Sequence, residues 1–170
     1  MESNLSFEYL SDHHNQHIFD FECEDEIIVS NFLKEDAIKF QITKSTVTRL
    51  YFDQDEQLIG YFTLFNDLVE VLRNKREKQK WTDFVIGVNE FPAVRIHYIG
   101  VDSRYRNKGF GKYLLLEAIN IAKDISINSG CNFITVEVLE KSLWFYEKYK
   151  FIHLGYSGKY RKMALRFDQF

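Results

Sequence analysis

The sequence predicts an α/β fold in which helices pack against a mixed sheet. Runs of β-branched and aromatic residues alternate with amphipathic stretches, in the order strand, helix, hairpin, long strand, helix, strand, helix, strand. Strand–helix–strand units of this kind favour a mixed sheet covered by helices. Hydrophobic residues make up 45% of the chain, including 16 Phe and 10 Tyr, which is enough apolar surface for a core without disulfides.

The amino-terminal half predicts an edge strand, a helix and a hairpin. Residues 5–10 alternate between apolar and polar side chains, and the polar residues 12–22 form a connection. Residues 24–41 repeat apolar side chains at about the 3.6-residue period of a helix. The runs 46–53 and 58–64 are separated by a short polar turn, which is typical of a hairpin.

The carboxyl-terminal half predicts three more strands and two helices. Residues 94–101 are mostly β-branched and aromatic, which indicates a central strand, and residues 109–128 form a clear amphipathic helix. A strand over 133–138, a short helix over 141–150 and a final strand over 160–167 follow. Because no linker separates these elements, we expect a single domain over residues 1–170.

Charge and composition restrict the class of protein. The formal net charge is −3, which gives no general attraction to nucleic acid or membrane but leaves room for a local basic patch. Cys23 and Cys131 lie far apart in the sequence, so we expect reduced thiols in a reducing compartment. No signal peptide and no run of about 20 apolar residues is visible. We therefore expect a cytoplasmic protein.

The segment after the strand 94–101 carries the strongest functional signal. A polar, basic loop with two glycines leads directly into the helix 109–128. A helix start presents unpaired N–H groups and the positive end of the helix dipole, which together suit a pyrophosphate. Gly109 and Gly111 allow the chain close to the phosphate oxygens, and Arg106 and Lys108 supply positive charge.

The alternative for this loop is a surface turn with a capping glycine and solvated charges, because short glycine motifs produce false positives. Two familiar phosphate-binding motifs are excluded. No Gly-Lys-Ser/Thr sequence is present, and the third glycine of Gly-x-Gly-x-x-Gly is missing.

Arg106-x-x-Gly109-x-Gly111 resembles the Gln/Arg-x-x-Gly-x-Gly/Ala motif of the GNAT superfamily of N-acetyltransferases. The resemblance extends over residues 5–167 in the order of elements. It implies a mixed, mostly antiparallel twisted sheet of six to seven strands flanked by about four helices, with acetyl-coenzyme A (acetyl-CoA) as co-substrate and no metal. The residues it implies in cofactor binding are Ile99, Gly100 and Val101 through the backbone, and Arg106, Asn107, Lys108, Gly109, Phe110, Gly111 and Lys112 around the phosphates.

A second motif lies near the carboxyl terminus. Residues 142–151 are similar to the Ala-x-x-Phe-Tyr-Glu-Lys-x-Gly-Phe helix of the same superfamily, which makes Tyr146 the general acid that protonates the departing thiolate. The alternative is that Tyr146 is a core aromatic residue without a catalytic role. Tyr149 is the substitute candidate for the general acid. The chain departs from the family at Leu139, where many members have Asn, and at Lys150, where they have Gly.

The sequence contains two candidates for the general base. Glu137 and His97 both lie on predicted strands and are candidates, although charged strand residues more often face solvent. Water could also accept the proton of the acceptor amine, in which case no base is needed. We expect His13, His14 and His17 to be solvated loop residues rather than metal ligands, and the basic run 73–80 to be a solvated connection or a patch for an anionic acceptor such as RNA.

A narrower resemblance concerns the acceptor. Parts of the chain look like toxin-type GNAT proteins, which acetylate aminoacyl-tRNA and are neutralised by an antitoxin; these parts are residues 19–23, 31–37, 59–64, 98–102 and 145–146. The acidic net charge argues against tRNA. Three alternatives follow: an acetyltransferase acting on a primary amine of a small molecule, peptide or protein; a tRNA-modifying toxin; and a non-catalytic acyl-CoA sensor. A homodimer is also expected, from the exposed last strand and the aromatic content.

Overall fold

The computed structural model describes residues 5–84 and 87–170. The chain forms two compact units: unit 1 is Met1–Phe65 with Ile96–Ile119, and unit 2 is Asn66–Arg95 with Asn120–Phe170. The strands form one sheet in the order β1-β2-β3-β4-β5-β7-β6. Their bounds are β1 Ser6–Tyr9, β2 Val47–Phe52, β3 Leu58–Glu70, β4 Glu90–Val101, β5 Phe133–Val138, β6 Ile152–Ser157 and β7 Tyr160–Arg166. Both β3 and β4 run through the two units.

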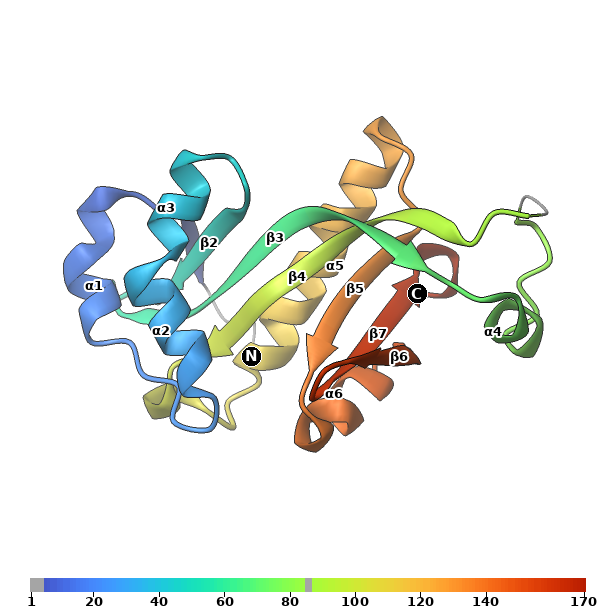
Figure 1. Ribbon diagram of the computed structural model, residues 1–170. Coiled ribbons are helices and arrows are strands. Elements are labelled where there is room, and N and C mark those ends of the chain that lie inside the picture. The colour runs from blue at the N-terminus through green and yellow to red at the C-terminus, as the bar shows by residue number, and fades with distance from the viewer. Residues whose placement is uncertain (1–4, 85–86) are drawn as a thin grey trace. The chain divides into compact units, whose positions relative to one another are not determined.

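Unit 1 combines the amino-terminal strands with three helices. β1 pairs antiparallel with β2, and β2 with β3. The helices α1 (Asn15–Phe19), α2 (Ile27–Glu35) and α3 (Ala37–Ile42) pack in sequence on one another, and α3 packs on β2 (Figure 1). The core of unit 1 includes Leu33 of α2, Leu50 of β2, Tyr61 of β3 and Phe21, which follows α1.

Two expectations for unit 1 are corrected. The single helix predicted over 24–41 is divided at Asp36, whose φ of −122° ends α2 and precedes α3. The connection predicted over 12–22 contains a 3-10 turn (Asp12–His14) and α1. The 3-10 turn starts at a capping box. In it the His14 side chain accepts a hydrogen bond from the Ser11 N–H at 3.1 Å, at the position where Glu is usual. Because histidine replaces Glu at that position, the sequence lacks the usual capping-box pattern from which a helix start is predicted.

Unit 2 contains an antiparallel set of strands in which β7 lies between β5 and β6. β6 was not predicted, since its residues are half-buried and interrupted by Gly155, where the register with β7 shifts. The last strand is therefore not the edge of the sheet, and the expectation of an exposed last strand is wrong. Trp81, Phe91 and Phe133 form the centre of this unit's core.

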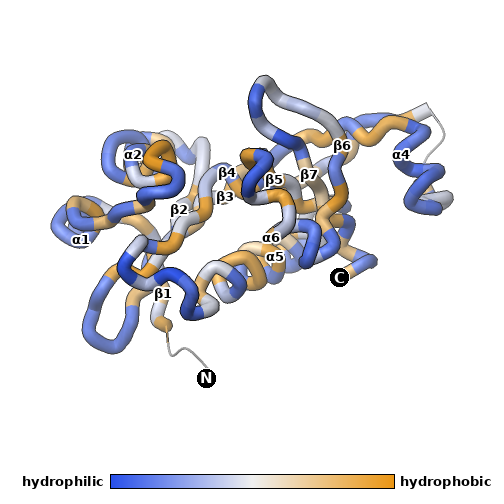
Figure 2. The backbone as a smooth tube through the Cα atoms, turned by 90° about the horizontal axis from the view of Figure 1, so that it is seen from below, coloured by the Kyte–Doolittle hydropathy of each residue, from blue (hydrophilic) through white to orange (hydrophobic). Residues whose placement is uncertain are grey.

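The basic run 73–80 is a helix rather than a connection. α4 spans Arg73–Lys78, and Arg76 within it is buried. The Arg76 guanidinium donates to the Asn89 Oδ1 at 2.8 Å and lies 5.7 Å from the centroid of the Phe91 ring. One cation of the run is therefore structural, while α4 as a whole is among the most hydrophilic parts of the chain (Figure 2).

The remaining helices are α5 (Phe110–Asn128) and α6 (Leu143–Glu147). α5 matches the predicted helix closely, because its apolar side chains Leu114, Leu115, Ala118 and Ala122 recur at the helical period and are all fully buried. None of the helices in the described residues is both long and apolar enough to cross a membrane.

Candidate functional site

The predicted phosphate loop lies in unit 1 between β4 and α5. A 3-10 turn (Ser103–Tyr105) follows β4, and the chain then reaches α5 at Phe110. Gly109 has φ +88°, and a Cβ added there would meet no atom within 4 Å. Glycine is therefore required by the backbone conformation and not by crowding. The N–H groups that open α5 have no carbonyl partner within the helix, which is the arrangement that suits a bound diphosphate.

Arg106, the predicted phosphate ligand, has partners of its own in this structure. Its guanidinium forms an ion pair with Asp25 and contacts the Cys23 sulfur at 3.3 Å. Burial raises the pKa of the Cys23 thiol, although the charge of Arg106 offsets part of this effect. A phosphate that engages Arg106 must therefore compete with the exposed Asp25 carboxylate. Lys108 lies over the Tyr105 ring, with its Nζ 5.4 Å from the centroid.

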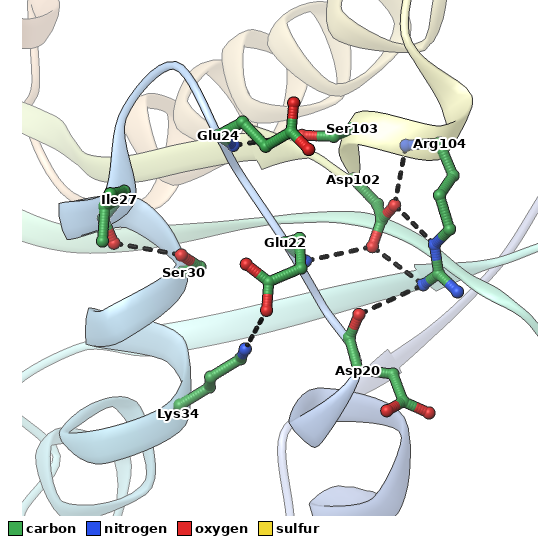
Figure 3. A network of polar contacts seen from close by, with 9 residues as sticks. All are labelled: Asp20, Glu22, Glu24, Ile27, Ser30, Lys34, Asp102, Ser103 and Arg104. Carbon is green, nitrogen blue, oxygen red and sulfur yellow. Dashed lines mark hydrogen bonds and ion pairs between the residues drawn. The ribbon is translucent and has the colours of Figure 1, made fainter.

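A buried carboxylate that the sequence did not single out holds the start of the loop. Asp102 is fully buried and accepts hydrogen bonds from the Arg104 N–H at 2.9 Å, the Arg104 guanidinium at 2.8 and 2.9 Å, and the Glu22 N–H at 3.1 Å (Figure 3). Burial by itself would raise the pKa of Asp102. The hydrogen bonds from Arg104 and Glu22 outweigh it and hold this pKa below its ordinary value.

The segment around Glu22 is bound to the loop at further points. The Ser103 N–H donates to the Glu22 carbonyl at 2.8 Å, and the Glu24 N–H donates to the Ser103 Oγ at 3.0 Å (Figure 3). Lys34 on α2 pairs with the Glu22 carboxylate at 2.8 Å. Residues far apart in the sequence are thus joined, so the amino-terminal helices fix where the phosphate loop begins.

The backbone of β4 passes close to its neighbours at two glycines. A Cβ on Gly60 would lie 2.6 Å from the Gly100 carbonyl oxygen, and a Cβ on Gly100 would lie 2.6 Å from the Val29 Cγ1. Both glycines are therefore needed for packing. Gly60 had no functional signal in the sequence beyond its resemblance to the toxin-type proteins. The predicted backbone contacts of Ile99, Gly100 and Val101 with the cofactor stay predictions.

Tyr146, the predicted general acid, lies in unit 2 on α6. Its side chain is buried, and its ring meets the rings of Phe145 and Phe151 edge to face, with centroids 5.2 and 5.5 Å away. The loop residues and Tyr146 belong to different units, and each group is described within its own. The acid role of Tyr146 stays a prediction, as does the substitute role of Tyr149.

The family's glycine after this helix has a clear physical reason. Lys150, which replaces it, has φ +65°, a left-handed conformation that favours glycine. The Lys150 and Phe151 N–H groups still donate to the carbonyls of Glu147 and Tyr146 at 2.9 and 3.2 Å. The turn therefore keeps its hydrogen bonds in spite of the substitution, at some cost in backbone strain.

The two candidate bases differ in their surroundings. In unit 2 the Glu137 carboxylate accepts from Arg95 at 3.1 Å, and Arg95 also pairs with Asp67 at 2.8 Å. In unit 1 the His97 ring lies among aromatic rings, 5.0 Å from that of Phe32 and 4.4 Å from that of Tyr98. Glu137 is therefore already engaged by a cation, and the base assignment stays a prediction for both residues.

The expectation of solvated histidines is wrong for His14. This side chain is buried, stacks on Phe52 with ring centroids 5.8 Å apart, and places its Nε2 2.9 Å from the Glu8 carboxylate. Within residues 5–84 and 87–170, no group of three His, Cys, Asp or Glu side chains could hold a metal ion.

A strand that leads through a glycine-containing loop into a helix start is an arrangement that suits a phosphate-bearing cofactor. Residues 15–151 match the acetyltransferase (GNAT) family, and the chain belongs to this family. It is an acetyl-CoA-dependent acetyltransferase, and the predicted GNAT fold is confirmed. The comparison with curated proteins gave no match.

Solved structures resemble the chain over nearly its whole length. AtaT complexed with acetyl-methionyl-tRNAfMet has a TM-score of 0.81 and 23% identity, with 98% of this chain and 96% of that chain covered. A tyrosine-to-phenylalanine mutant of KacT has a TM-score of 0.81 and 23% identity, with 97% and 96% covered. AtaTR bound with acetyl-CoA has a TM-score of 0.75 and 21% identity, with 99% and 96% covered.

Proposed function

We propose that this acetyltransferase transfers the acetyl group of acetyl-CoA to the amino group of an aminoacyl-tRNA, as a cytoplasmic toxin neutralised by an antitoxin. One observation carries the proposal: the likeness to AtaT complexed with acetyl-methionyl-tRNAfMet extends over 98% of this chain. A related structure holds the AtaT toxin with the carboxyl terminus of the antitoxin AtaR.

The distribution of charge supports a tRNA substrate despite the acidic net charge of the chain. The net charge of −3 is the sum of two units whose net charges have opposite signs. Unit 2 contains fourteen Lys and Arg against ten Asp and Glu, a net charge of +4, whereas unit 1 contains eight against fifteen, a net charge of −7. A polyanion is attracted by local positive potential and not by the sum over the chain.

The cofactor is proposed to bind along the end of β4 and the start of α5. The N–H groups that open α5, from Phe110 onward, have no carbonyl within the helix to bind and face the diphosphate. The Ile99–Val101 backbone holds the pantetheine arm. Arg106 exchanges the Asp25 carboxylate for a phosphate oxygen, which turns an existing ion pair into a cofactor contact.

The chemical step is direct transfer. The neutral amine attacks the thioester carbonyl carbon and forms a tetrahedral intermediate. Collapse of this intermediate breaks the C–S bond, and the coenzyme A sulfur takes the proton of the Tyr146 phenol. The amine gives its proton to water or to a base such as Glu137, the amide forms, and the Tyr146 phenolate recovers a proton from water. A phenol suits the acid role because it is protonated at neutral pH.

The test is an acetylation assay with purified protein, acetyl-CoA and charged tRNA, read out as N-acetyl-aminoacyl-tRNA. We expect product with the wild-type protein and a turnover reduced about 10²–10⁴-fold in Tyr146→Phe, with coenzyme A binding unchanged. Phe145→Leu is the matched control, because it changes the adjacent aromatic residue and leaves the phenol. Arg106→Ala combined with Gly109→Glu should weaken coenzyme A binding in calorimetry.

Two results would contradict the proposal. Thiol release with small amines or peptides, but none with charged tRNA, would show that the acceptor is such an amine, which is the first alternative given by the sequence. Coenzyme A binding without turnover on any acceptor, unaffected by Tyr146→Phe, would make the chain a sensor.

A further inference from the structure

Two cations of unit 2, Lys75 and Arg161, lie close together where α4 approaches β6. Lys75 on α4 extends to β6, and its Nζ donates to the His153 carbonyl at 3.1 Å. Arg161 on β7 lies beside the same histidine, with its Nη1 3.5 Å from the His153 Nε2. Tyr156 completes the group, and we call Lys75, His153, Tyr156 and Arg161 the α4–β6 surface.

A bulge in β6 brings these side chains to one face. Residues three apart on a regular strand point to opposite faces. The register between β6 and β7 shifts between His153 and Gly155, so His153 and Tyr156 have their rings together, with centroids 5.3 Å apart. Arg161 is the register partner of Tyr156, and its guanidinium carbon lies 4.1 Å from the Tyr156 ring centroid.

The surface has a net positive charge despite one acidic neighbour. Glu140 accepts from the Arg161 Nε at 2.6 Å. Lys75 takes part in no ion pair within the described residues. The effect of these cations is visible at His153, because burial together with the charges of Arg161 and Lys75 lowers the pKa of its imidazole. The lowered pKa favours the neutral form of the ring.

The aromatic member distinguishes this surface from a simple ion-exchange patch. Tyr156 is 65% exposed, and the Arg161 guanidinium lies over its ring. Cations with an exposed aromatic ring are the combination that single-stranded nucleic acid uses, because phosphates pair with Lys and Arg while unstacked bases stack on the ring. An acidic peptide would use the cations but gain little from the ring.

We propose that the α4–β6 surface binds a single-stranded segment of RNA, with a base stacked on Tyr156 and phosphates on Lys75 and Arg161. This inference rests on the proposed tRNA substrate and adds the residues that would hold it. The surface lies entirely within unit 2.

The test measures binding separately from catalysis. Fluorescence anisotropy would use labelled, uncharged tRNA and a labelled single-stranded RNA of about 12 nucleotides, a length within the range of known single-strand sites. The variants are Tyr156→Ala, Tyr156→Phe, Lys75→Ala and Glu140→Gln. The control is Lys39→Ala on α3, which removes one exposed cation from unit 1. Thermal unfolding of each variant checks that it is folded.

The variants have distinct expected results. Tyr156→Ala should weaken binding of both RNAs about tenfold or more. Tyr156→Phe should bind like the wild-type protein, because the ring remains. Lys75→Ala should reduce the slope of log affinity against log salt by about 0.7 on the single strand, whereas Lys39→Ala should not. Glu140→Gln should strengthen binding, since it removes the carboxylate that competes for Arg161. If Glu140→Gln instead damaged the structure of this surface, RNA binding would weaken.

Failure of this inference differs from failure of the proposed function. Wild-type acetylation of charged tRNA with RNA affinity unchanged in Tyr156→Ala and Lys75→Ala would refute the surface alone. RNA binding that depends on these residues without acetylation of any charged tRNA would refute the proposed function alone. Equal effects of the variants on an acidic peptide and on RNA would identify a protein-binding surface and overturn the proposal.

Discussion

Replacing Asp102 by Asn tests whether the buried carboxylate holds the phosphate loop in place. Asn has almost the same shape, but it removes the negative charge and turns an NH2 group toward the donors of Arg104. Four hydrogen bonds to the carboxylate are affected, three from Arg104 and one from Glu22. Removing one partner of a buried charge pair costs about 3–5 kcal/mol. Because Arg104 is half exposed, we expect a loss near the lower end, about 3 kcal/mol.

This loss should be visible in thermal unfolding at pH 7 as a decrease in Tm of about 6–12 °C for a chain of this length. Asp124→Asn, on an exposed position of α5, is the matched control and should change stability by less than about 0.5 kcal/mol. Coenzyme A binding should also weaken in Asp102→Asn, because the start of the loop loses its attachment to the segment around Glu22.

The pH dependence provides a second, independent test. The pKa of Asp102 is lower in the folded chain than its ordinary value, so its contribution to stability is complete above the unfolded pKa of about 3.9. The contribution is lost as the pH falls through the lower, folded pKa. The difference between wild type and Asp102→Asn in urea unfolding should therefore shrink below about pH 4. A difference that stays constant well below about pH 4, or a Tm at pH 7 equal to that of wild type, would refute the reasoning.

Three glycine-related predictions follow from backbone geometry. Gly109→Ala should lower stability by about 1–2 kcal/mol, because φ is +88° there, and should reduce coenzyme A affinity in calorimetry; unchanged values of both would contradict the loop assignment. Lys150→Gly should raise the unfolding free energy by about 0.5–1 kcal/mol, since it relieves a φ of +65°, and a loss in urea unfolding would show that the side chain matters more. Gly60→Ala should cost about 1–3 kcal/mol through its contact with the Gly100 carbonyl, whereas Gly130→Ala, with open space around it, should cost far less in the same assay.

The strands and the long helix could be predicted because their signals are local. β5 and α5 have the bounds expected from hydrophobic period to within a residue, and the glycine motif that opens α5 identified the family. Where the local signal was weak, prediction failed. β6 is half-buried and carries a bulge, and the 3-10 turn before α1 begins at a capping box with His14 in place of Glu.

The candidate site was predicted only in part, for the same reason. The positions of Arg106, Gly109 and Tyr146 were evident from their motifs. The partners that surround them come from distant parts of the sequence: Asp25 beside Arg106, and Glu22 beside Asp102. No periodicity or spacing encodes such pairs, because they are formed only when the amino-terminal helices pack against β4.

The sequence by itself determined the fold class and the acetyltransferase family and predicted a phosphate loop, because these depend on residues close together along the chain. Tertiary structure alone decided which charges are compensated and which collect on one surface. Net charge is a sum over the sequence, whereas electrostatic potential depends on distance in space. An acidic chain can therefore carry a basic unit, and only the folded arrangement brings Lys75, Tyr156 and Arg161 together around His153.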